Sequence, residues 1–292
     1  MDLPPLDDQL RAKESRLRDI LAGGGRTLLA YSGGVDSGYL AVVAHRLLGD
    51  ALTAVLADSA SLADWERDEA LDFARGQSIP VRVLATHEID NPSYRANAPD
   101  RCFFCKQELF QHMEALAAAE GFDTLIYGGN HSDLGEHRPG AEAARRYRVR
   151  APLAEAGLAK GEIRRLAREL DLAIWDRPAR ACLASRIPHF SEVTESKLTQ
   201  LGAAEKLLRD LGFRDYRVRH HDKLARIELG ADEWQRLTDP SRRGAVDAGL
   251  RALGFASVSL DLRPFSSGSL SAMSRGPRTR ESGGLTGSEP SA

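Results

Sequence analysis

Short apolar runs alternate with amphipathic segments along the first half of the chain, and each has about the length of one strand or one helix. Apolar runs of four to eight residues bounded by turn residues indicate buried strands, and apolar residues three or four apart indicate helices. We expect strands at 27–31, 52–57, 81–86 and 124–127, and helices at 6–21, 35–48, 64–77, 105–120 and 156–170. This alternation predicts an α/β domain with a parallel sheet, and a ligand site outside the carboxyl ends of its strands.

The order of elements changes after a connection rich in Pro and Arg at 175–190. Beyond it we expect helices at 191–211 and 245–253, and strands at 215–219, 225–229 and 257–262. We therefore predict a first domain at 1–186 and a smaller α+β domain at 187–265. The last segment, 266–292, is rich in Ser, Gly and Arg with few apolar residues, a composition that predicts a disordered tail.

Composition excludes some classes of protein. The 292 residues are 42% hydrophobic and 28% charged, and 40 Lys and Arg against 42 Asp and Glu leave a net charge of −2. A protein that coats nucleic acid needs an excess of basic residues, so we expect no nucleic-acid partner. Acids and bases interrupt the first twenty residues, and no run of about 18 apolar residues follows. We therefore expect a cytoplasmic protein without a membrane partner.

The string SGGVDS at 32–37 lies between an expected strand and an expected helix. Backbone N–H groups at the start of a helix bind phosphate, and glycines such as Gly33 and Gly34 allow the close approach. Ser32 and Ser37 can add hydroxyl donors, and Asp36 can hold a Mg²⁺ ion that bridges phosphates. A simple turn between a strand and a helix is the alternative. The string SGGVDS resembles the PP-loop of the N-type ATP pyrophosphatases, and this resemblance favours an ATP-binding loop. The Walker A pattern is absent.

Three cysteines, an odd number, indicate metal, redox or nucleophilic chemistry in preference to a disulfide framework. Cys102 and Cys105 form a C-x-x-C pair at the expected start of a helix, and Cys182 stands alone between Arg180 and Arg186. A zinc site with a histidine as fourth ligand, a thioredoxin-like dithiol and a three-thiolate iron–sulfur cluster are all open, as are three unconnected buried thiols. The two arginines favour a thiolate at Cys182.

Five motifs occur in a characteristic order: SGGVDS, RCFFCK, GGNHSDLGEHRPG, RACLASRIP and RVRHHDKLARIEL. Over residues 10–268 the chain closely resembles the LarE family of ATP-dependent sulfur transferases, within the PP-loop N-type ATP pyrophosphatases. The resemblance implies a Rossmann-like PP-loop fold and adenylation of a carboxylate of pyridinium-3,5-biscarboxylic acid mononucleotide. Sulfur then replaces AMP to give a thiocarboxylate, in the biosynthesis of the nickel-pincer nucleotide, the cofactor of lactate racemase.

The resemblance also implies two alternative sulfur sources. Some members give up the sulfur of one cysteine, which matches Cys182 here, and keep dehydroalanine. Others resemble holders of a 4Fe-4S cluster with an exchangeable sulfide. Because Cys102, Cys105 and Cys182 are all present, we expect the cluster type, with an external sulfide source as partner. A homo-oligomer, a hexamer by resemblance, is expected.

For the ATP site the resemblance adds Asp58, Gly129, Asp133 and Arg138. The loop reads Gly-Gly-Asn-His-Ser-Asp where a Thr and a second acid are often found, so the set of Mg²⁺ ligands stays open beyond Asp36.

In the second domain, alternation along a strand puts Arg217 and Arg219 on one face, and Arg226 and Glu228 share a face of the next strand. The residues alone are equally consistent with a solvated polar face. The resemblance implies that Arg217 and Arg219 hold the substrate phosphate, which suits guanidinium groups, and that Glu228 is a catalytic member of that site.

Two rival functions remain at this stage. A PP-loop tRNA thiolase also adenylates an oxygen and inserts sulfur, although no RNA-binding module is visible in the sequence. A non-catalytic cluster or nucleotide-sensing module is the second rival, and an intact Asp36 in the loop speaks against it.

Overall fold

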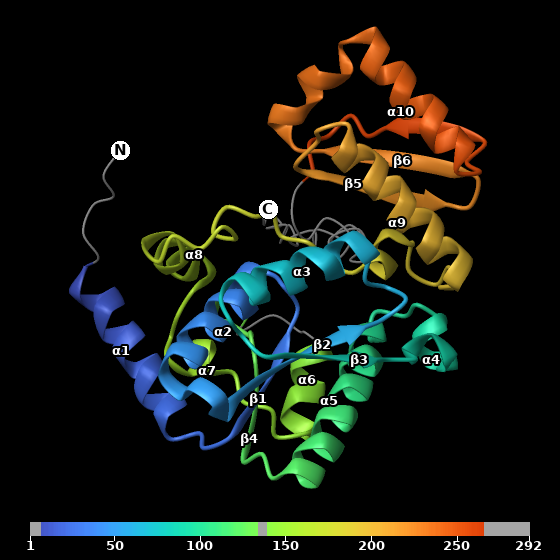
Figure 1. The fold of residues 1–292 in the computed structure, drawn as a ribbon. Coiled ribbons are helices and arrows are strands. Elements are labelled where there is room, and N and C mark those ends of the chain that lie inside the picture. The colour runs from blue at the N-terminus through green and yellow to red at the C-terminus, as the bar shows by residue number, and fades with distance from the viewer. Residues whose placement is uncertain (1–6, 134–138, 266–292) are drawn as a thin grey trace, which may run out of the picture.

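A parallel sheet of four strands, in the order β3-β2-β1-β4, forms the centre of the first unit in the computed structural model, which describes residues 7–133 and 139–265 (Figure 1). The parallel pairing confirms the predicted α/β class. The strands are Thr27–Tyr31 (β1), Leu52–Asp58 (β2), Val81–Ala85 (β3) and Thr124–Tyr127 (β4), each within one residue of the expected bounds.

Helices cover both faces of this sheet, because side chains along each strand alternate between the faces. The helices of this unit are α1 (Asp8–Ala22), α2 (Val35–Leu48), α3 (Asp64–Gly76), α4 (Pro92–Arg95), α5 (Arg101–Glu120), α6 (Pro139–Arg146), α7 (Pro152–Glu155) and α8 (Lys160–Glu169). Leu28 and Ala30 of β1 pack with α5 and α6, whereas Leu29 and Tyr31 pack with α1, α2, α3 and α8.

Several helices differ from the expectation: the short α4 was not expected, and the helix expected at 245–253 begins at Pro240. The helix expected at 105–120 begins at Arg101, so the whole C-x-x-C motif is helical. The helix expected at 156–170 begins only at Lys160, because Gly157, with a φ of +77°, lies in the turn that separates it from the short α7, which was not expected. The short α6 was not expected, since it follows a segment rich in Gly and charged residues.

The second unit has a three-stranded sheet in the order β5-β6-β7, in which β5 (Tyr216–His221) and β6 (Leu224–Leu229) are antiparallel and β7 (Ser257–Leu260) is parallel to β6. Helices α9 (Glu195–Asp210) and α10 (Pro240–Ala252) pack on its apolar face, which carries Val218 and Ile227. A 3-10 segment, Ala231–Leu237, joins β6 to α10 and was not expected.

The core of the second unit extends into the first. Its apolar cluster, which includes α9, α10 and the second sheet, also buries Trp65 of α3, Tyr94 of α4 and Ile89, which precedes α4. Figure 1 accordingly shows α3 directly below the second unit. The predicted tail at 266–292 lies outside the described residues. Among the described helices, none is long and apolar enough to cross a membrane.

Candidate active site

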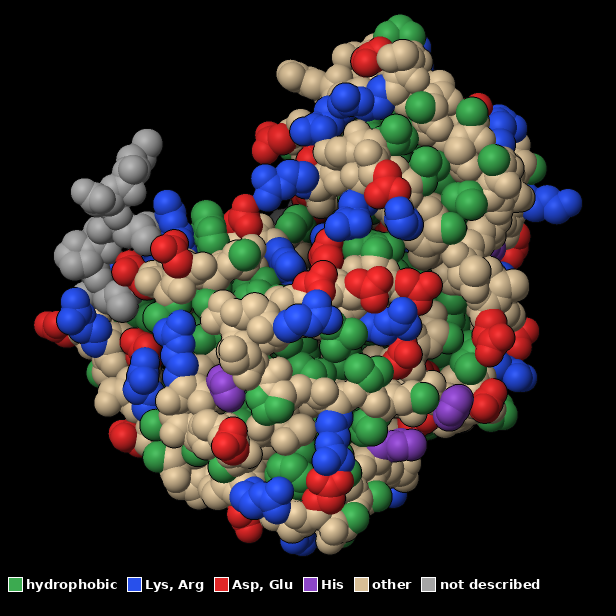
Figure 2. All heavy atoms as spheres, in the orientation of Figure 1, with side chains coloured by type: hydrophobic (Ala, Val, Ile, Leu, Met, Phe, Trp, Pro, Cys, Tyr) green, Lys and Arg blue, Asp and Glu red, His purple; other side chains and the backbone are tan. Residues whose placement is uncertain are grey.

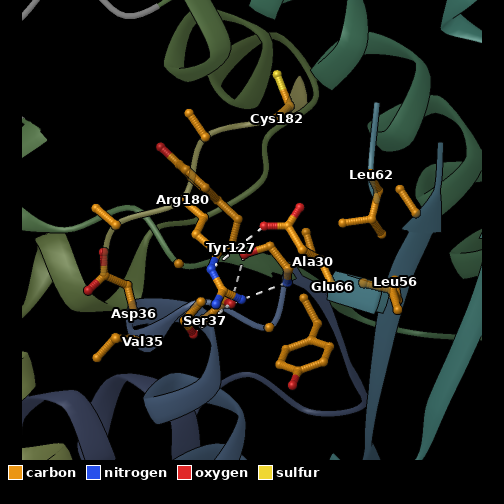
Figure 3. Close-up of a pocket in the computed structure, with 18 of the residues that line it drawn as sticks. Ala30, Val35, Asp36, Ser37, Leu56, Leu62, Glu66, Tyr127, Arg180 and Cys182 are labelled. Carbon is orange, nitrogen blue, oxygen red and sulfur yellow. Dashed lines mark hydrogen bonds and ion pairs between the residues drawn. The ribbon is translucent and has the colours of Figure 1, made fainter. Parts of the chain in front are cut away.

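A cavity of about 390 Å³ lies at the carboxyl ends of β1 and β2, where the fold class predicts a ligand site. Its volume is within the range of about 300–1,000 Å³ that is typical of small-molecule sites. Its wall contains the whole 32–37 loop, and also Cys105 and Cys182 (Figure 3). The predicted phosphate loop and two of the three cysteines therefore share one cavity.

The 32–37 loop keeps the amino end of α2 open toward the cavity. Gly33 has a φ of +71°, and a Cβ there would lie 2.5 Å from the Cβ of Ala70, so only glycine fits. The Ser32 and Ser37 hydroxyls lie 3.0 Å apart and hold the loop closed. Gly34 precedes α2 without a side-chain cap among the described residues, which leaves N–H groups of the first turn for an anion.

Asp36, in the first turn of α2, has one satisfied and one unsatisfied carboxylate oxygen. Oδ2 accepts a hydrogen bond of 3.0 Å from Asn130 Nδ2, whereas the buried Oδ1 has no partner among the described residues. Burial raises the pKa of Asp36, and the positive charge of Lys160 opposes this shift. An orphaned carboxylate oxygen beside a phosphate loop fits a Mg²⁺ ligand, the role expected of Asp36, which stays a prediction.

A basic wall that the sequence analysis missed faces this loop. Lys160, Arg164 and Arg177 line the cavity, and Arg177 Nη1 donates to the carbonyl of Gly33 over 3.3 Å. Arg164 is held by the carbonyl of Trp175 at 2.7 Å. The signal was present in the sequence, because Lys160 and Arg164 are four residues apart at the start of one helix.

The cysteines lie together although Cys182 is far from the C-x-x-C pair in sequence. Arg101 interacts with both Cys102 and Cys182, and its Nη2 lies 3.9 Å from the Cys182 sulfur. Cys105 and Cys182 are half-buried, whereas the Cys102 side chain reaches solvent. The structure therefore brings all three predicted residues into one neighbourhood, on α5 and on the 3-10 turn Leu183–Arg186 that follows Cys182.

Burial raises the pKa of the Cys105 thiol, and the negative charge of Glu88 adds to this. The protein atoms around Cys102 displace water from its thiol and raise its pKa as well. The neighbouring Cys182 adds to this shift, and the positive charge of Arg101 opposes it. Within the described part of the chain, no three His, Cys, Asp or Glu side chains form a metal-binding group. Three neighbouring thiols fit an iron–sulfur cluster in the chemistry of their donors, since thiolates are the usual ligands of such clusters.

Arg180 and Arg186, which the sequence analysis placed beside the Cys182 thiolate, are directed to carboxylates. Arg180 pairs with Glu69 at 2.8 Å, and Arg186 pairs with Glu205 at 2.5 Å. In Figure 3 the Arg180 side chain lies between Cys182 and the 32–37 loop. Arg186 still interacts electrostatically with Cys182, but the cation that donates to its sulfur is Arg101. The sequence analysis did not single out Arg101, because it is remote in sequence from Cys182.

The predicted phosphate-binding arginines lie behind the cavity wall. Arg219 Nη2 pairs with Glu228 at 2.7 Å, and its Nη1 donates to the carbonyl of Ser185 at 2.8 Å. Arg217 donates to the carbonyl of Ala179, a residue of the cavity wall. Burial lowers the pKa of Arg217 to about 10, and the neighbouring charge of Arg186 contributes. Charged side chains gather along the junction of the two units in Figure 2.

The remaining predicted ATP-site residues lie outside the cavity wall or outside the described residues. Asp58, at the end of β2, pairs with Arg67 at 3.2 Å. Asp133 Oδ2 accepts a hydrogen bond of 3.1 Å from the backbone of Asn130, close to Asp36. The carbonyl of Gly129 accepts from the backbone of Ala154 at 3.2 Å, and its neighbour Gly128 lines the cavity in its place. Arg138 is not among the described residues.

Similar proteins span nearly the whole chain. An uncharacterized protein from Synechocystis is 41% identical over 261 residues, which are 89% of this chain and 97% of the relative. The pyridinium-3,5-bisthiocarboxylic acid mononucleotide synthase of Lactiplantibacillus plantarum is 34% identical over 89% of this chain and 94% of its own length. The glutamine-hydrolysing GMP synthase of Streptococcus thermophilus is 27% identical over 80% of this chain but only 44% of its own length. A scan against models of known families finds no match.

Proposed function

The chain belongs to the LarE family of ATP-dependent sulfur transferases, and on this premise we propose that it converts a carboxylate of pyridinium-3,5-biscarboxylic acid mononucleotide to a thiocarboxylate. The chain is an ATP-dependent enzyme. The observation that carries the proposal is the single cavity, which has a phosphate loop in one part of its wall and Cys182 in another. Nickel-pincer nucleotide synthesis, with repetition of the reaction on the second carboxylate, is part of the proposal, as is a homo-oligomeric assembly.

The first step is adenylation. A substrate carboxylate oxygen attacks the α-phosphorus of ATP, a P–O bond forms, and pyrophosphate leaves with the electron pair of the broken bond. The open N–H groups of α2 would hold the phosphates, and Lys160 and Arg177 would offset their negative charge. Asp36 would hold Mg²⁺, which lowers the charge repulsion between carboxylate and phosphate when it is bound.

The second step is sulfur transfer. A sulfur anion attacks the carbonyl carbon of the acyl adenylate, a C–S bond forms, and AMP leaves with the electrons of the broken C–O bond. If Cys182 is the donor, its Cβ–S bond breaks with loss of the Cα proton, and dehydroalanine remains. With all three cysteines present we favour a bound 4Fe-4S cluster, which would supply an exchangeable sulfide and so spare Cys182.

Substrate binding involves the second unit in this proposal. Arg217 has its nearest carboxylate, Asp215, at 3.8 Å, so its charge is only weakly paired and suits a phosphate. Arg219 is paired with Glu228, which leaves Glu228 to orient Arg219. We therefore assign the substrate phosphate to Arg217 first, and Arg219 and Glu228 to its support.

Anaerobic purification with iron and acid-labile sulfide analysis tests the sulfur source, together with intact mass before and after turnover with ATP and the biscarboxylate. We expect iron in the protein and an unchanged mass after several turnovers. An iron-free protein that loses the mass of hydrogen sulfide after one transfer would instead make Cys182 the consumed donor. A protein that forms no thiocarboxylate with either sulfur source would overturn the proposed function.

A further inference from the structure

The guanidinium of Arg101 is buried beside sulfur, not beside a carboxylate. Its side chain is only 6% exposed, and Nη2 is 3.9 Å from the Cys182 sulfur. Four arginines are buried among the described residues, and Arg101 is the one without a carboxylate oxygen within 4.0 Å. The other three pairs are Arg186 with Glu205 at 2.5 Å, Arg217 with Asp215 at 3.8 Å and Arg219 with Glu228 at 2.7 Å. A buried cation without a counter-charge raises the free energy of the folded state, so we expect an anion next to Arg101.

Hydrogen bonds to two other segments of the chain fix the position of Arg101 beside the Cys182 sulfur. Arg101 is the first residue of α5, and its Nη1 donates to the carbonyl of Ala184 at 2.8 Å, two residues after Cys182. Nη1 also donates to Oδ1 of Asn97, which is fully buried. The Asn97 amide in turn donates to the carbonyl of Pro188 at 2.8 Å. These contacts hold the guanidinium against the Cys182 turn.

We propose that Arg101 is the positioning residue of the sulfur-transfer step, and that the anion it faces is the donor sulfur at Cys182. This inference rests on the proposed function, in which the sulfur is anionic either as attacking thiolate or as cluster ligand. Arg101 fixes the direction of that sulfur through a charge-assisted hydrogen bond and ties its turn to the helix that carries Cys102. It takes no part in the bonds that form and break.

Because Arg101 lies away from the phosphate loop, its substitution should affect sulfur transfer without affecting adenylation. Arg101 contacts the Cys182 turn, the Cys182 sulfur and Asn97, which follows α4, whereas the cavity wall around the phosphate loop is formed by other residues. Loss of its charge should therefore slow sulfur transfer and spare the ATP half-reaction. A residue that only supported the fold would affect both half-reactions together.

The variants Arg101→Met and Arg101→Lys test this, with Arg95→Met as control. Arg95 lies on the neighbouring α4 and pairs with Glu192 at 3.3 Å on the surface, so it matches Arg101 in charge and region but not in its contact with sulfur. Substrate-dependent exchange of pyrophosphate into ATP measures adenylation, and single-turnover formation of thiocarboxylate measures transfer. Alkylation of Cys182 by iodoacetamide in metal-free protein at one fixed pH, followed by peptide mass spectrometry, is a readout that needs no loaded enzyme.

For Arg101→Met we expect exchange within about twofold of the wild type, and transfer and Cys182 alkylation slower by about tenfold or more, the effect of losing one charge-assisted hydrogen bond. Arg101→Lys should recover part of both, and Arg95→Met should change neither. Wild-type transfer and alkylation in a folded Arg101→Met protein would overturn the proposal, as would equal losses in both half-reactions. If the wild type shows no exchange with the biscarboxylate, the proposed function fails, while the alkylation comparison still decides the role of Arg101.

Discussion

At the level of single residues, sequence reasoning worked where the requirement is local and missed what only the fold brings together. The need for glycine at position 33 can be read from the loop string, because a phosphate loop must approach its ligand closely. The cation beside Cys182 could not be found this way. Its sequence neighbours Arg180 and Arg186 turn to carboxylates, whereas Arg101 reaches the sulfur from another helix.

Substitution of Gly33 by Ala should weaken ATP binding by about tenfold or more. The new methyl group meets Ala70, and the left-handed backbone costs a non-glycine residue about 1–2 kcal/mol, so the loop must shift. Gly76→Ala, with open space around the glycine and no positive φ, is the control and should bind ATP normally. Isothermal calorimetry with ATP measures both. Equal affinities would show that the loop tolerates the methyl group and does not grip the phosphates closely.

At the level of elements, strands were predicted more closely than helices. Apolar runs fix β1 and β2 within one residue, since these central strands are buried on both faces and need a largely apolar segment. The break between α7 and α8 depends on the backbone of Gly157, which periodicity does not report. Between α9 and β5 the second unit also has a polar pair, the buried His220 and the half-buried Gln200, that no apolar pattern indicates.

The stability of the second unit should fall in mild acid because of His220. Its Nδ1 accepts from the backbone of Asp222 at 3.2 Å and its Nε2 lies 2.8 Å from Gln200 Oε1, an arrangement that suits the neutral ring. Burial lowers the pKa of His220, and the charge of Lys197 adds to this. The folded state therefore stays neutral while the unfolded state takes up a proton, so this stabilisation is complete above about pH 6.5 and is lost as pH falls through the unfolded pKa toward the folded one.

Urea unfolding followed by circular dichroism at pH 7.5 and 5.5 tests this for the wild type and for His220→Gln. The variant keeps an amide that can reach Gln200 but cannot titrate. We expect the wild type to lose more stability than the variant between the two pH values, by up to about 1 kcal/mol. Parallel losses would mean that His220 titrates alike in the folded and unfolded states.

At the level of the whole molecule, the two units are joined by a cluster of charged and aromatic side chains as well as by a shared apolar core. The guanidinium groups of Arg180 and Arg209 both lie over the ring of Trp65 on α3, at 4.6 and 5.0 Å from the ring centre. Glu69, one turn further along α3, pairs with both arginines at 2.8 and 2.6 Å. We propose that the boundary expected near residue 186 is a rigid joint of this kind, and not a flexible linker.

Removal of the Glu69 charge should loosen this joint. Glu69→Gln leaves two half-exposed arginines without their shared anion, and we expect a loss of roughly 1–2 kcal/mol with faster amide exchange in α9. Asp72→Asn is the matched control on the same helix, because its ion pair with Arg75 is largely exposed and should contribute less than about 0.5 kcal/mol. Thermal unfolding and hydrogen exchange measure both. The same result for the two variants would contradict a joint at Glu69.

The shared cavity also has a consequence for the stoichiometry of the reaction. In the proposed reaction an acyl adenylate would form at the phosphate loop and meet the Cys182 sulfur within the same cavity, with less exposure to the bulk water that would hydrolyse it. The ratio of AMP released to thiocarboxylate formed therefore reports how well the cavity protects its intermediate. In the wild type this ratio should be close to one, and in Arg101→Met it should rise, because an activated carboxylate that waits for its sulfur is lost to water.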